Sequence, residues 1–584
     1  MTTGSGAVPF KAPEDRRFLA LHAGHDSNVA VVDGLGTVRF AVSEERLNRI
    51  KQYPGFPRLG LEMAMAKFPE GFDALYTVRM PRMARILREA CFLANSLRKG
   101  LTHPRGLGMA GVYLGKLKGR TLETEDHGAW VSLAERLPLI NIEHHLAHAA
   151  SAFYPSGFEK AYVMTLDGEG DSLSGGFYWA DEKGLKRYRS FYYNEVTCGR
   201  DYEKVTAMLG FHPLRHPGKI TGLAAYGKYN QACIEKLRQY LKNTWRRRPD
   251  RRHLTHHAYQ VISDEGRREL QRIRRELFKD FPDEDMAYAI QDILEERVLD
   301  LLEANTDYRR GSIVLAGGVF ANVKLNRRIK DLGFQNIFIH PAMTDQGLSV
   351  GAVLYHLGEV GKLASIPYQD VFFGPSFSND ALREALLSAG LTFETMDRPH
   401  ERVAELLLAG RVVALFQGAM EYGPRALGHR SILYHTQDPT VNDWLNKRLQ
   451  RTEFMPFAPV TLAEEADRCY LDMDGARYAA KFMTITFDCT EWMQRTSPAV
   501  VHVDGTARPQ LIGRDDDPYY YGILSHYHRI SGIPSLINTS FNMHEEPIVC
   551  TPEDAIRAFL RGHLDYLALG PYLVEHTETP VRRS

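Results

Sequence analysis

The sequence has few cysteines, no long apolar run and no surplus of charge. Its six cysteines among 584 residues show no CxxC spacing, which argues for reduced thiols and against a disulfide framework or a zinc knuckle. Lys+Arg and Asp+Glu both total 72, so no overall charge attracts nucleic acid or an anionic membrane. No run of 18 apolar residues offers a membrane span. Residues 1–15, which we expect to form a flexible tail, lack the apolar core of a signal peptide. We therefore expect a cytoplasmic protein whose partners are small molecules, with no nucleic acid and no membrane.

A strand–loop–hairpin pattern occurs twice in a chain that is too long for one hydrophobic core. The first copy starts at Arg16 and its first apolar run ends at Gly24-His25-Asp26. The second starts at Lys160, and its first run ends at Asp167 in "LDGEGD". Strand ends are where α/β sheets present ligand groups. The repeat predicts two related lobes of the actin-like, ribonuclease-H-like type, with nucleotide in the cleft between them.

Three histidines crowd the stretch "NIEHHLAHAASAFYPS", residues 141–156. In a helix, His144 and His148 share one face, and His145 points elsewhere. Two imidazoles four residues apart can bind one divalent metal ion. A pair of hydrogen-bonded helix histidines would show the same spacing, so the residues alone leave both interpretations open.

Two later loops carry further candidate ligands. "GSIVLAGGVFANVKLN" predicts a strand, a Gly317-Gly318 turn and a helix that opens near Asn322, where the backbone can approach a phosphate or a ribose. An ordinary strand–helix turn is the alternative. In "PAMTDQGLSVGA", Asp345 either caps the helix that follows or offers an oxygen to a metal.

Eight motifs follow one another in the order of a known family. They are His25-Asp26, "SEERLNRIK", "EHHLAHAASAF", "LDGEGD", "AGGVFANVKLN", "PAMTDQGLSVGA", "YGPRALGHRSI" and "NTSFNMHEEPIV". From about residue 17 to 575 the chain resembles the carbamoyltransferases of the nodulation-protein U, cephalosporin and tobramycin type. The resemblance implies an α/β protein (α+β overall). Residues 16–362 would form an actin-like carbamoyl-transfer domain with lobes at 16–155 and 156–362. Residues 363–400 would connect it to a YrdC-like domain at 401–584 that makes carbamoyl-adenylate.

The resemblance also implies the composition of the cleft. His144, His148, Asp167 and Asp345 would bind Fe²⁺ or another divalent metal, and His145 would support them or serve the fold. ATP would enter as the cosubstrate with Mg²⁺, and the nucleotide-binding residues would be Gly168, Gly317, Gly318, Asn322 and Asp345. At the acceptor end, His25, Asp26 and Lys51 would be catalytic. An imidazole that titrates near neutrality suits removal of a proton from the acceptor.

The donor, carbamoyl phosphate, would bind in the YrdC-like part. The residues implied are Arg425, Arg448, Arg451, Arg508, Ser540 and Asn542. Guanidinium groups and a hydroxyl suit a compact dianion. The chain departs from the family at "LQRTEFMPFAP", residues 449–459, where Leu449 and Met455 occupy positions at which the family carries a lysine and an arginine. Either Arg448 and Arg451 compensate from a shifted register, or the donor is held differently.

The predicted function is ATP-dependent carbamoyl transfer, through carbamoyl-adenylate, to a hydroxyl or less readily an amine of a small natural product, as in antibiotic biosynthesis. Two alternatives remain. One is a regulatory family member that binds metal and nucleotide without forming the adenylate, and the other is an actin-fold kinase of a small molecule. A homodimer is compatible with the sequence.

Overall fold

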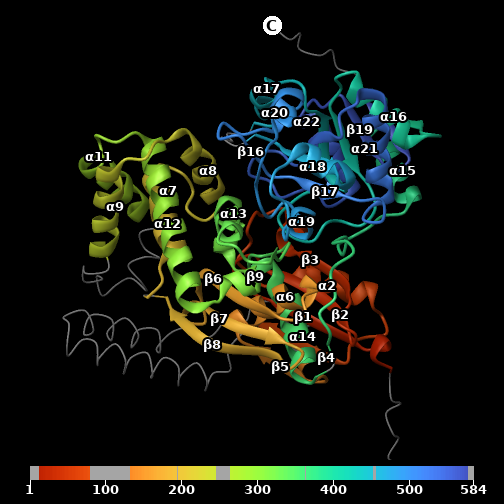
Figure 1. Ribbon diagram of the computed structural model, residues 1–584. Helices are drawn as coiled ribbons and strands as arrows, with labels where there is room; N and C mark the ends of the chain where they lie inside the picture. The colour runs from red at the N-terminus through yellow and green to blue at the C-terminus, as the bar shows by residue number, and fades with distance from the viewer. Residues whose placement is uncertain are drawn as a thin grey trace, which may run out of the picture.

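The computed structural model describes residues 12–78, 132–193, 195–244, 263–361, 363–450 and 456–576. Two β-sheets and a lateral group of helices form the N-terminal part, and a third sheet with its own helices forms the C-terminal part (Figure 1). Among the described residues, no helix combines the length and the apolar character needed to cross a membrane.

The first lobe is built on a five-stranded sheet. Its elements are β1 (Arg17–His22), β2 (Asn28–Asp33), β3 (Val38–Ser43), α1 (Glu44–Asn48), α2 (Arg58–Lys67), β4 (Ala74–Val78) and β5 (Leu139–Ile142). The strand order is β3-β2-β1-β4-β5, with β1, β2 and β3 antiparallel and β4 and β5 parallel to β1. Every residue of β2 is buried, as expected for its apolar run between two neighbouring strands. Asp33 accepts the N–H groups of Leu35 and Thr37 and so closes the β2–β3 turn.

The second lobe repeats this topology. Its strands are β6 (Ala161–Gly170), β7 (Leu173–Asp181), β8 (Gly184–Tyr192), β9 (Ser312–Ala316) and β10 (Asn336–Ile339). Their order, β10-β9-β6-β7-β8, gives each strand the same neighbours as its counterpart in the first lobe. The predicted two-lobed actin-like fold is therefore confirmed.

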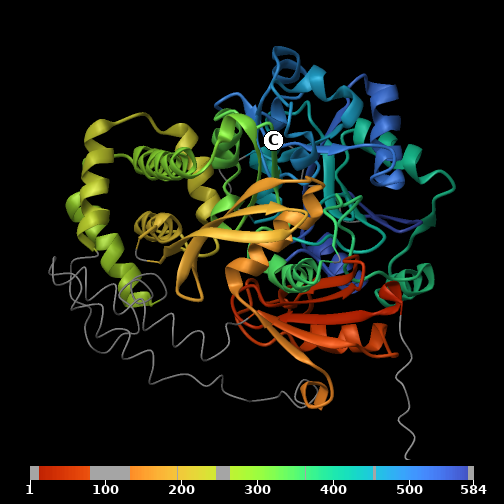
Figure 2. The same ribbon diagram turned by 60° about the horizontal axis from the view of Figure 1, so that its bottom comes forward.

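Two central helices join the lobes. α6 (His144–Phe153) follows the first sheet but packs on β6, β7 and β9, whereas α14 (Leu348–Glu359) follows the second sheet but packs on β1, β2 and β4. They touch each other closely, because a Cβ at Gly351 of α14 would lie 2.0 Å from the carbonyl oxygen of Ala147. The alanines of α6 are thus explained by a narrow helix–helix contact. In Figure 2 the two helices lie between the sheets.

A helical insert flanks the second lobe, on the left of Figure 1. It contains α7 (Cys198–Met208), α8 (Pro217–Leu223), α9 (Gln231–Thr244), α11 (Asp264–Leu277) and α12 (Asp283–Asn305). α13 (Val323–Asp331) follows the glycine turn after β9 and contacts α12.

The C-terminal part is a mixed eight-stranded sheet of order β11-β20-β19-β12-β13-β18-β14-β17. Its strands are β11 (Glu394–Thr395), β12 (Val413–Phe416), β13 (Arg430–His435), β14 (Ala458–Leu462), β17 (Gln510–Ile512), β18 (Ser535–Ser540), β19 (Tyr566–Leu569) and β20 (Tyr572–Glu575). Its longer helices are α15 (Asn379–Ser388), α16 (Pro399–Leu408), α17 (Val441–Arg448), α20 (Glu491–Thr496), α21 (Pro518–Ser531) and α22 (Pro552–Arg561). The two-residue strands β15 (Phe487–Asp488) and β16 (Thr506–Ala507) pair beside it, and α18 (Ala466–Cys469) and α19 (Arg477–Ala480) are short.

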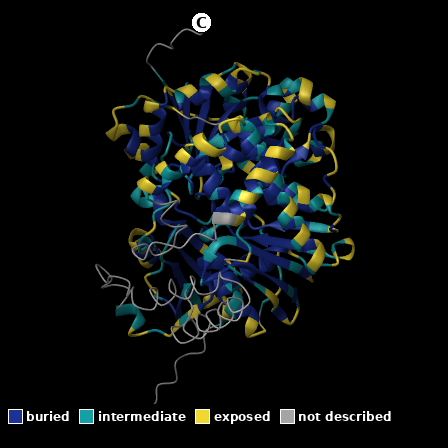
Figure 3. Ribbon diagram, turned by 90° about the vertical axis from the view of Figure 1, so that its left-hand side faces the viewer, coloured by how far each residue is buried: buried dark blue, intermediate teal, exposed yellow. Residues whose placement is uncertain are grey.

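The C-terminal unit begins before residue 401. Strand β11 pairs with β20, and α15 packs on α22, so residues 379–395 belong to this unit rather than to a connecting segment. The interior strands of all three sheets are buried, and the exposed residues lie mainly on the outer helices and loops (Figure 3).

Candidate active site

Four side chains meet in the cleft between the N-terminal lobes. His144 and His148 come from the first two turns of α6, Asp167 from β6, and Asp345 from the loop before α14. The two histidine Nε2 atoms are 3.1 Å apart. The Asp345 Oδ1 atom lies 3.5 Å from Nε2 of His144 and 3.4 Å from that of His148, and Asp167 Oδ2 lies 3.7 and 3.3 Å from the same two atoms. The ligand atoms thus surround one point.

These separations fit a bound divalent cation. Donor atoms about 2.1 Å from a tetrahedral metal ion are about 3.4 Å apart, close to the observed spacing. Two imidazole nitrogens and two carboxylate oxygens suit borderline metals such as Fe²⁺ or Zn²⁺. Burial by itself lowers the pKa of His144, but the charges of Asp345 and Asp167 outweigh it and raise that pKa to about 9. The cleft therefore favours positive charge at the point that the four ligands share.

Close backbone packing sets the position of His144. A Cβ at Gly170, at the end of β6, would lie 2.1 Å from Cδ2 of the His144 ring, so no larger residue fits there without moving the ring. Asp171, in the turn after Gly170, accepts the N–H of His144 and so caps the first turn of α6. The sheet of the second lobe therefore holds the first ligand of the helix.

His145 lies outside this group. It is fully buried, its Nε2 contacts the carbonyl oxygen of Leu173 at 3.2 Å, and burial lowers its pKa to about 3. Reasoning from sequence missed His22, at the end of β1, whose Nε2 is 3.6 Å from the second oxygen of Asp345. The position of His22 at the end of an apolar run could have identified it, because Asp167 was chosen for the same kind of position.

His25 and Asp26 lie at the edge of the cleft. His25 Nδ1 is 3.6 Å from Asp26 Oδ2, and its Nε2 has no partner within the described part of the chain. Burial lowers the pKa of His25, but the charges of Asp26, Asp345 and Asp167 outweigh it and raise the pKa above its ordinary value. Burial raises the pKa of Asp26 to about 7.

Asn28 links the two lobes behind this pair and was also missed. Its amide donates to the backbone carbonyls of Asp26 and Asp345, both at 2.8 Å. Its Oδ1 accepts the hydroxyl of Ser349, on α14. The loop that carries His25 is thereby fixed relative to the loop that carries Asp345.

Lys51 lies where three parts of the chain meet. Its backbone oxygen accepts Arg215 of the insert at 3.4 Å, and its charge is among those that hold the pKa of Glu545 down. On the preceding helix α1, Arg46 donates to the carbonyl of Gly423 at 3.0 Å. The C-terminal loop that follows Gly423 is thus adjacent to the first lobe.

The glycines predicted for the nucleotide border the metal group. Gly168 follows Asp167 and donates its N–H to that carboxylate. A Cβ at Gly318 would lie 3.1 Å from Asp167 Oδ1, and Gly317 has a φ of +109°, which a larger residue rarely adopts. Asn322 caps α13 and hydrogen-bonds Gln291 of α12. These residues lie along one side of the cleft, between β9 and the insert.

Three predicted donor residues are neighbours in sequence of one buried hydrogen-bond network in the C-terminal unit. The Asn538 amide donates to Gln510 at 2.7 Å and to the carbonyl of Ala426 at 3.2 Å, and the Gln510 amide donates to the carbonyl of Leu427 at 2.8 Å. Arg425 directly precedes Ala426, Arg508 lies two residues before Gln510, and Ser540 lies two residues after Asn538. The two buried amides, which reasoning from sequence missed, join the three chain segments that carry these residues.

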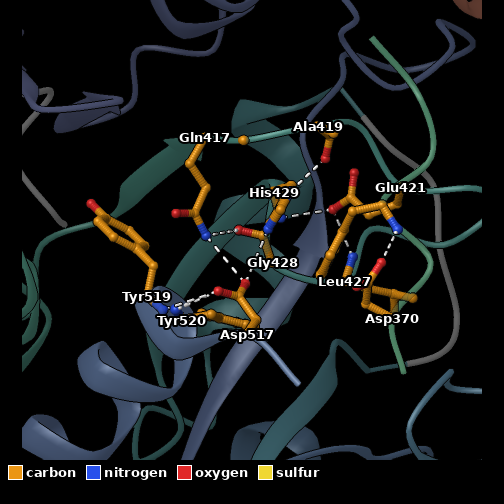
Figure 4. Close-up of polar contacts among 12 residues, drawn as sticks. Asp370, Gln417, Ala419, Glu421, Leu427, Gly428, His429, Asp517, Tyr519 and Tyr520 are labelled. Atoms are coloured by element: carbon orange, nitrogen blue, oxygen red, sulfur yellow. Dashed lines mark hydrogen bonds and ion pairs between the residues drawn. The ribbon is translucent and has the colours of Figure 1, made fainter. Parts of the chain in front are cut away.

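A buried carboxylate fixes the loop that carries Arg425. One oxygen of Glu421 accepts three backbone N–H groups, from Leu427 and His429 at 2.8 Å and from Arg430 at 2.9 Å. Figure 4 shows Glu421 with Leu427 and His429. The His429 ring contacts Asp517 at 3.1 Å. Charge-assisted hydrogen bonds of this kind are the stronger ones, so the loop is held rigidly.

The structure does not bring every predicted donor residue into this network. Arg448 pairs with Asp565 at 3.3 Å, and Asp565 also accepts the N–H of Val412. Val412 directly precedes β12, whereas the loop that carries Arg425 follows the other end of this strand. The Asn542 amide donates to the carbonyls of Met543 and Glu546 and so closes a turn. Arg451 and Met455 lie outside the described residues.

The described fold is an actin-like α/β part joined to a second α/β unit with cationic side chains of its own. The family described as Carbamoyltransferase N-terminus matches residues 17–354, and Carbamoyltransferase C-terminus matches residues 404–576. The chain therefore belongs to the carbamoyltransferase family and is a carbamoyltransferase.

The chain is similar to relatives over most of its length. An uncharacterized protein of Methanocaldococcus jannaschii is 35% identical over 74% of this chain and 73% of its own length. Nodulation protein NolNO of Sinorhizobium fredii is 31% identical over 94% of this chain and 79% of its own. The solved structure of the activator of the 2-hydroxyisocaproyl-CoA dehydratase from Clostridium difficile covers 59% of this chain and 95% of its own, at 12% identity and a TM-score of 0.33, which is too loose a likeness to argue from.

Proposed function

We propose that this carbamoyltransferase forms a carbamoyl-adenylate in its C-terminal unit from carbamoyl phosphate, ATP and one water molecule, with release of phosphate and pyrophosphate. It then transfers the carbamoyl group in the N-terminal cleft to a hydroxyl of a small natural product. The observation that carries the proposal is the convergence of His144, His148, Asp167 and Asp345 on one point of a cleft bordered by the glycine turns. The donor residues Arg425, Arg508 and Ser540 lie in a separate unit, which supports two half-reactions.

His144, His148, Asp167 and Asp345 would hold the metal, with Fe²⁺ as our choice among borderline ions. When bound, it supplies a Lewis acid for the negative charge that develops on the carbonyl and phosphate oxygens. Gly168, Gly317 and Gly318 leave room for the phosphate and ribose beside Asp167.

His25 would accept the acceptor's proton. Its Nε2 has no partner in the described residues, while Nδ1 faces Asp26, which orients the ring. As the acceptor oxygen bonds to the carbamoyl carbon, the bond from that carbon to the adenylate oxygen breaks, and AMP leaves with the electron pair. The acceptor's proton moves to His25 Nε2. Lys51 would anchor an anionic group at this end of the cleft.

The test is a reconstitution with ATP, Mg²⁺, carbamoyl phosphate, iron and candidate natural-product acceptors. We expect pyrophosphate release that depends on carbamoyl phosphate, and mass spectrometry should detect acceptor that carries one added carbamoyl group. His148→Ala should abolish transfer but retain pyrophosphate release, whereas Arg508→Ala should do the reverse when carbamoyl-adenylate is supplied. Wild-type protein loaded with metal that releases no pyrophosphate from ATP and carbamoyl phosphate would contradict the proposal.

A further inference from the structure

A cavity of the C-terminal unit adjoins the predicted donor residues. Its lining includes Phe457, Thr486, His502 and Arg508. Ala458, also in the lining, pairs with Asn538 of β18, two residues before Ser540. The cavity therefore contains Arg508, and one of its walls pairs with the strand that carries Ser540.

His502 is held in one orientation in the wall of this cavity. Its backbone N–H donates to the carbonyl of Thr506 and its carbonyl accepts the N–H of Gly505, so it opens a tight turn. Its Nδ1 lies 3.3 Å from Asp504 Oδ1 in that turn. Because a carboxylate only accepts hydrogen bonds, the Nδ1 atom carries the proton.

The second ring nitrogen of His502, Nε2, is then a hydrogen-bond acceptor. In the neutral ring with its proton on Nδ1, Nε2 presents a lone pair. Nε2 is shielded from solvent and has no hydrogen-bond partner in the parts of the chain that the structure describes. The side chain of His502 is 6% exposed. A buried acceptor without a partner is costly, which suggests that a ligand supplies the donor.

The turn is also tied to the N-terminal part. Lys324 of α13 donates to the second oxygen of Asp504 at 2.9 Å, and Lys324 lies two residues after Asn322. The ion pair and the hydrogen bonds from His502 and Thr506 hold the pKa of Asp504 far below its ordinary value, although burial opposes this. The carboxylate that orients His502 is therefore itself fixed from two sides.

Carbamoyl phosphate has one group that can donate a hydrogen bond to Nε2 of His502. Carbamoyl phosphate carries a phosphate, which suits Arg508, and an NH₂ group, whose N–H bonds need an acceptor. Acetyl phosphate has almost the same shape but carries a methyl group in place of the NH₂. A site built to hydrogen-bond an N–H group rejects an analogue that lacks it, because the buried acceptor is then left unpaired.

We infer that His502 is a specificity-determining residue of the donor pocket, whose Nε2 accepts a hydrogen bond from the carbamoyl NH₂ while Arg508 binds the phosphate. The inference rests on the proposed use of carbamoyl phosphate by this unit. It explains how the pocket would choose carbamoyl phosphate over other acyl phosphates.

The experiment compares two donors and three variants. Pyrophosphate release from ATP is measured with carbamoyl phosphate and with acetyl phosphate, for wild type, His502→Leu and His502→Gln, with His526→Leu on α21 as the matched surface control. We expect His502→Leu to lower kcat/KM for carbamoyl phosphate about 10- to 100-fold and to leave that for acetyl phosphate nearly unchanged. His502→Gln, whose amide oxygen is an acceptor, should recover part of the loss, and His526→Leu should behave as wild type.

Calorimetric titration separates this inference from the proposed function. Carbamoyl phosphate, acetyl phosphate and inorganic phosphate are titrated into the same proteins without ATP. Tighter binding of carbamoyl phosphate than of acetyl phosphate in wild type, lost in His502→Leu, would support the inference even if no pyrophosphate forms. An equal loss for both acyl phosphates, or an unchanged preference in His502→Leu, would overturn it. A wild type that binds carbamoyl phosphate no better than inorganic phosphate would also overturn it.

Discussion

Gly170→Ala should disable the metal site without altering any ligand. The added Cβ would lie 2.1 Å from Cδ2 and 2.5 Å from Nε2 of His144, whereas ordinary contact begins at 3.4 Å. The ring must therefore move by more than about 1 Å, while metal–ligand distances tolerate only about 0.2 Å. Mutating a hydrogen-bond partner of a metal ligand weakens metal binding by up to roughly 100-fold, and displacing a ligand itself should weaken it at least as much.

The assay is competition for metal between the protein and a chromophoric chelator, followed by elemental analysis. Gly168→Ala, in the same strand, is the matched control for metal affinity, because its Cβ would meet its nearest neighbour at 3.4 Å. Circular dichroism of both variants checks that the fold is kept. Wild-type metal affinity in a folded Gly170→Ala protein would refute the assignment of His144 as a ligand.

Four further predictions follow from the geometry. His148→Ala should abolish stoichiometric metal binding by elemental analysis, whereas His145→Gln, which keeps a donor for its buried carbonyl partner, should retain the metal. Arg508→Ala should block pyrophosphate release yet leave transfer from supplied carbamoyl-adenylate largely intact; equal loss of both would refute the division between the two units. Glu421→Gln should raise KM for carbamoyl phosphate about tenfold and change KM for ATP less, because a neutral amide holds the donor loop more weakly. Burial raises the pKa of Asp26 from 3.8 to about 7, so the folded state binds this proton more tightly than the unfolded state does. The metal-free protein should thus lose up to about 4 kcal/mol of stability as pH rises from about 4 to above 7, and urea unfolding of Asp26→Asn should show a smaller pH dependence.

The local sequence placed the candidate ligands on their elements, and the family resemblance made them one predicted group. The spacing of His144 and His148 places both on one face of a helix, and Asp167 follows the apolar run Ala161–Leu166, which forms the regularly paired part of β6. The repeated strand–loop–hairpin likewise predicted the two lobes. His22 and Asn28 were missed because a single polar residue at a strand end acquires meaning only when its neighbours across the cleft are known.

The donor site shows the opposite case. Nothing in the local sequence marks Asn538, Gln510 or Glu421 as the residues that join and hold the donor loop, since each bonds to backbone groups from 6 to 112 positions away. Arg448, which lies near the predicted phosphate positions in sequence, is instead paired with Asp565. The partner of a long, flexible cation depends on which carboxylate the fold places beside it.

The sequence by itself determined the elements whose cause is local: the helix that carries the histidine pair, the strands that end in carboxylates, and the glycine turns between strand and helix. Only the tertiary structure decided which of these meet. It packed α6 on the sheet of the opposite lobe, brought Gly170 against the ring of His144, and turned His502 toward Asp504 in the wall of a cavity. Such contacts depend on the packing of residues far apart in the chain, which local periodicity does not encode.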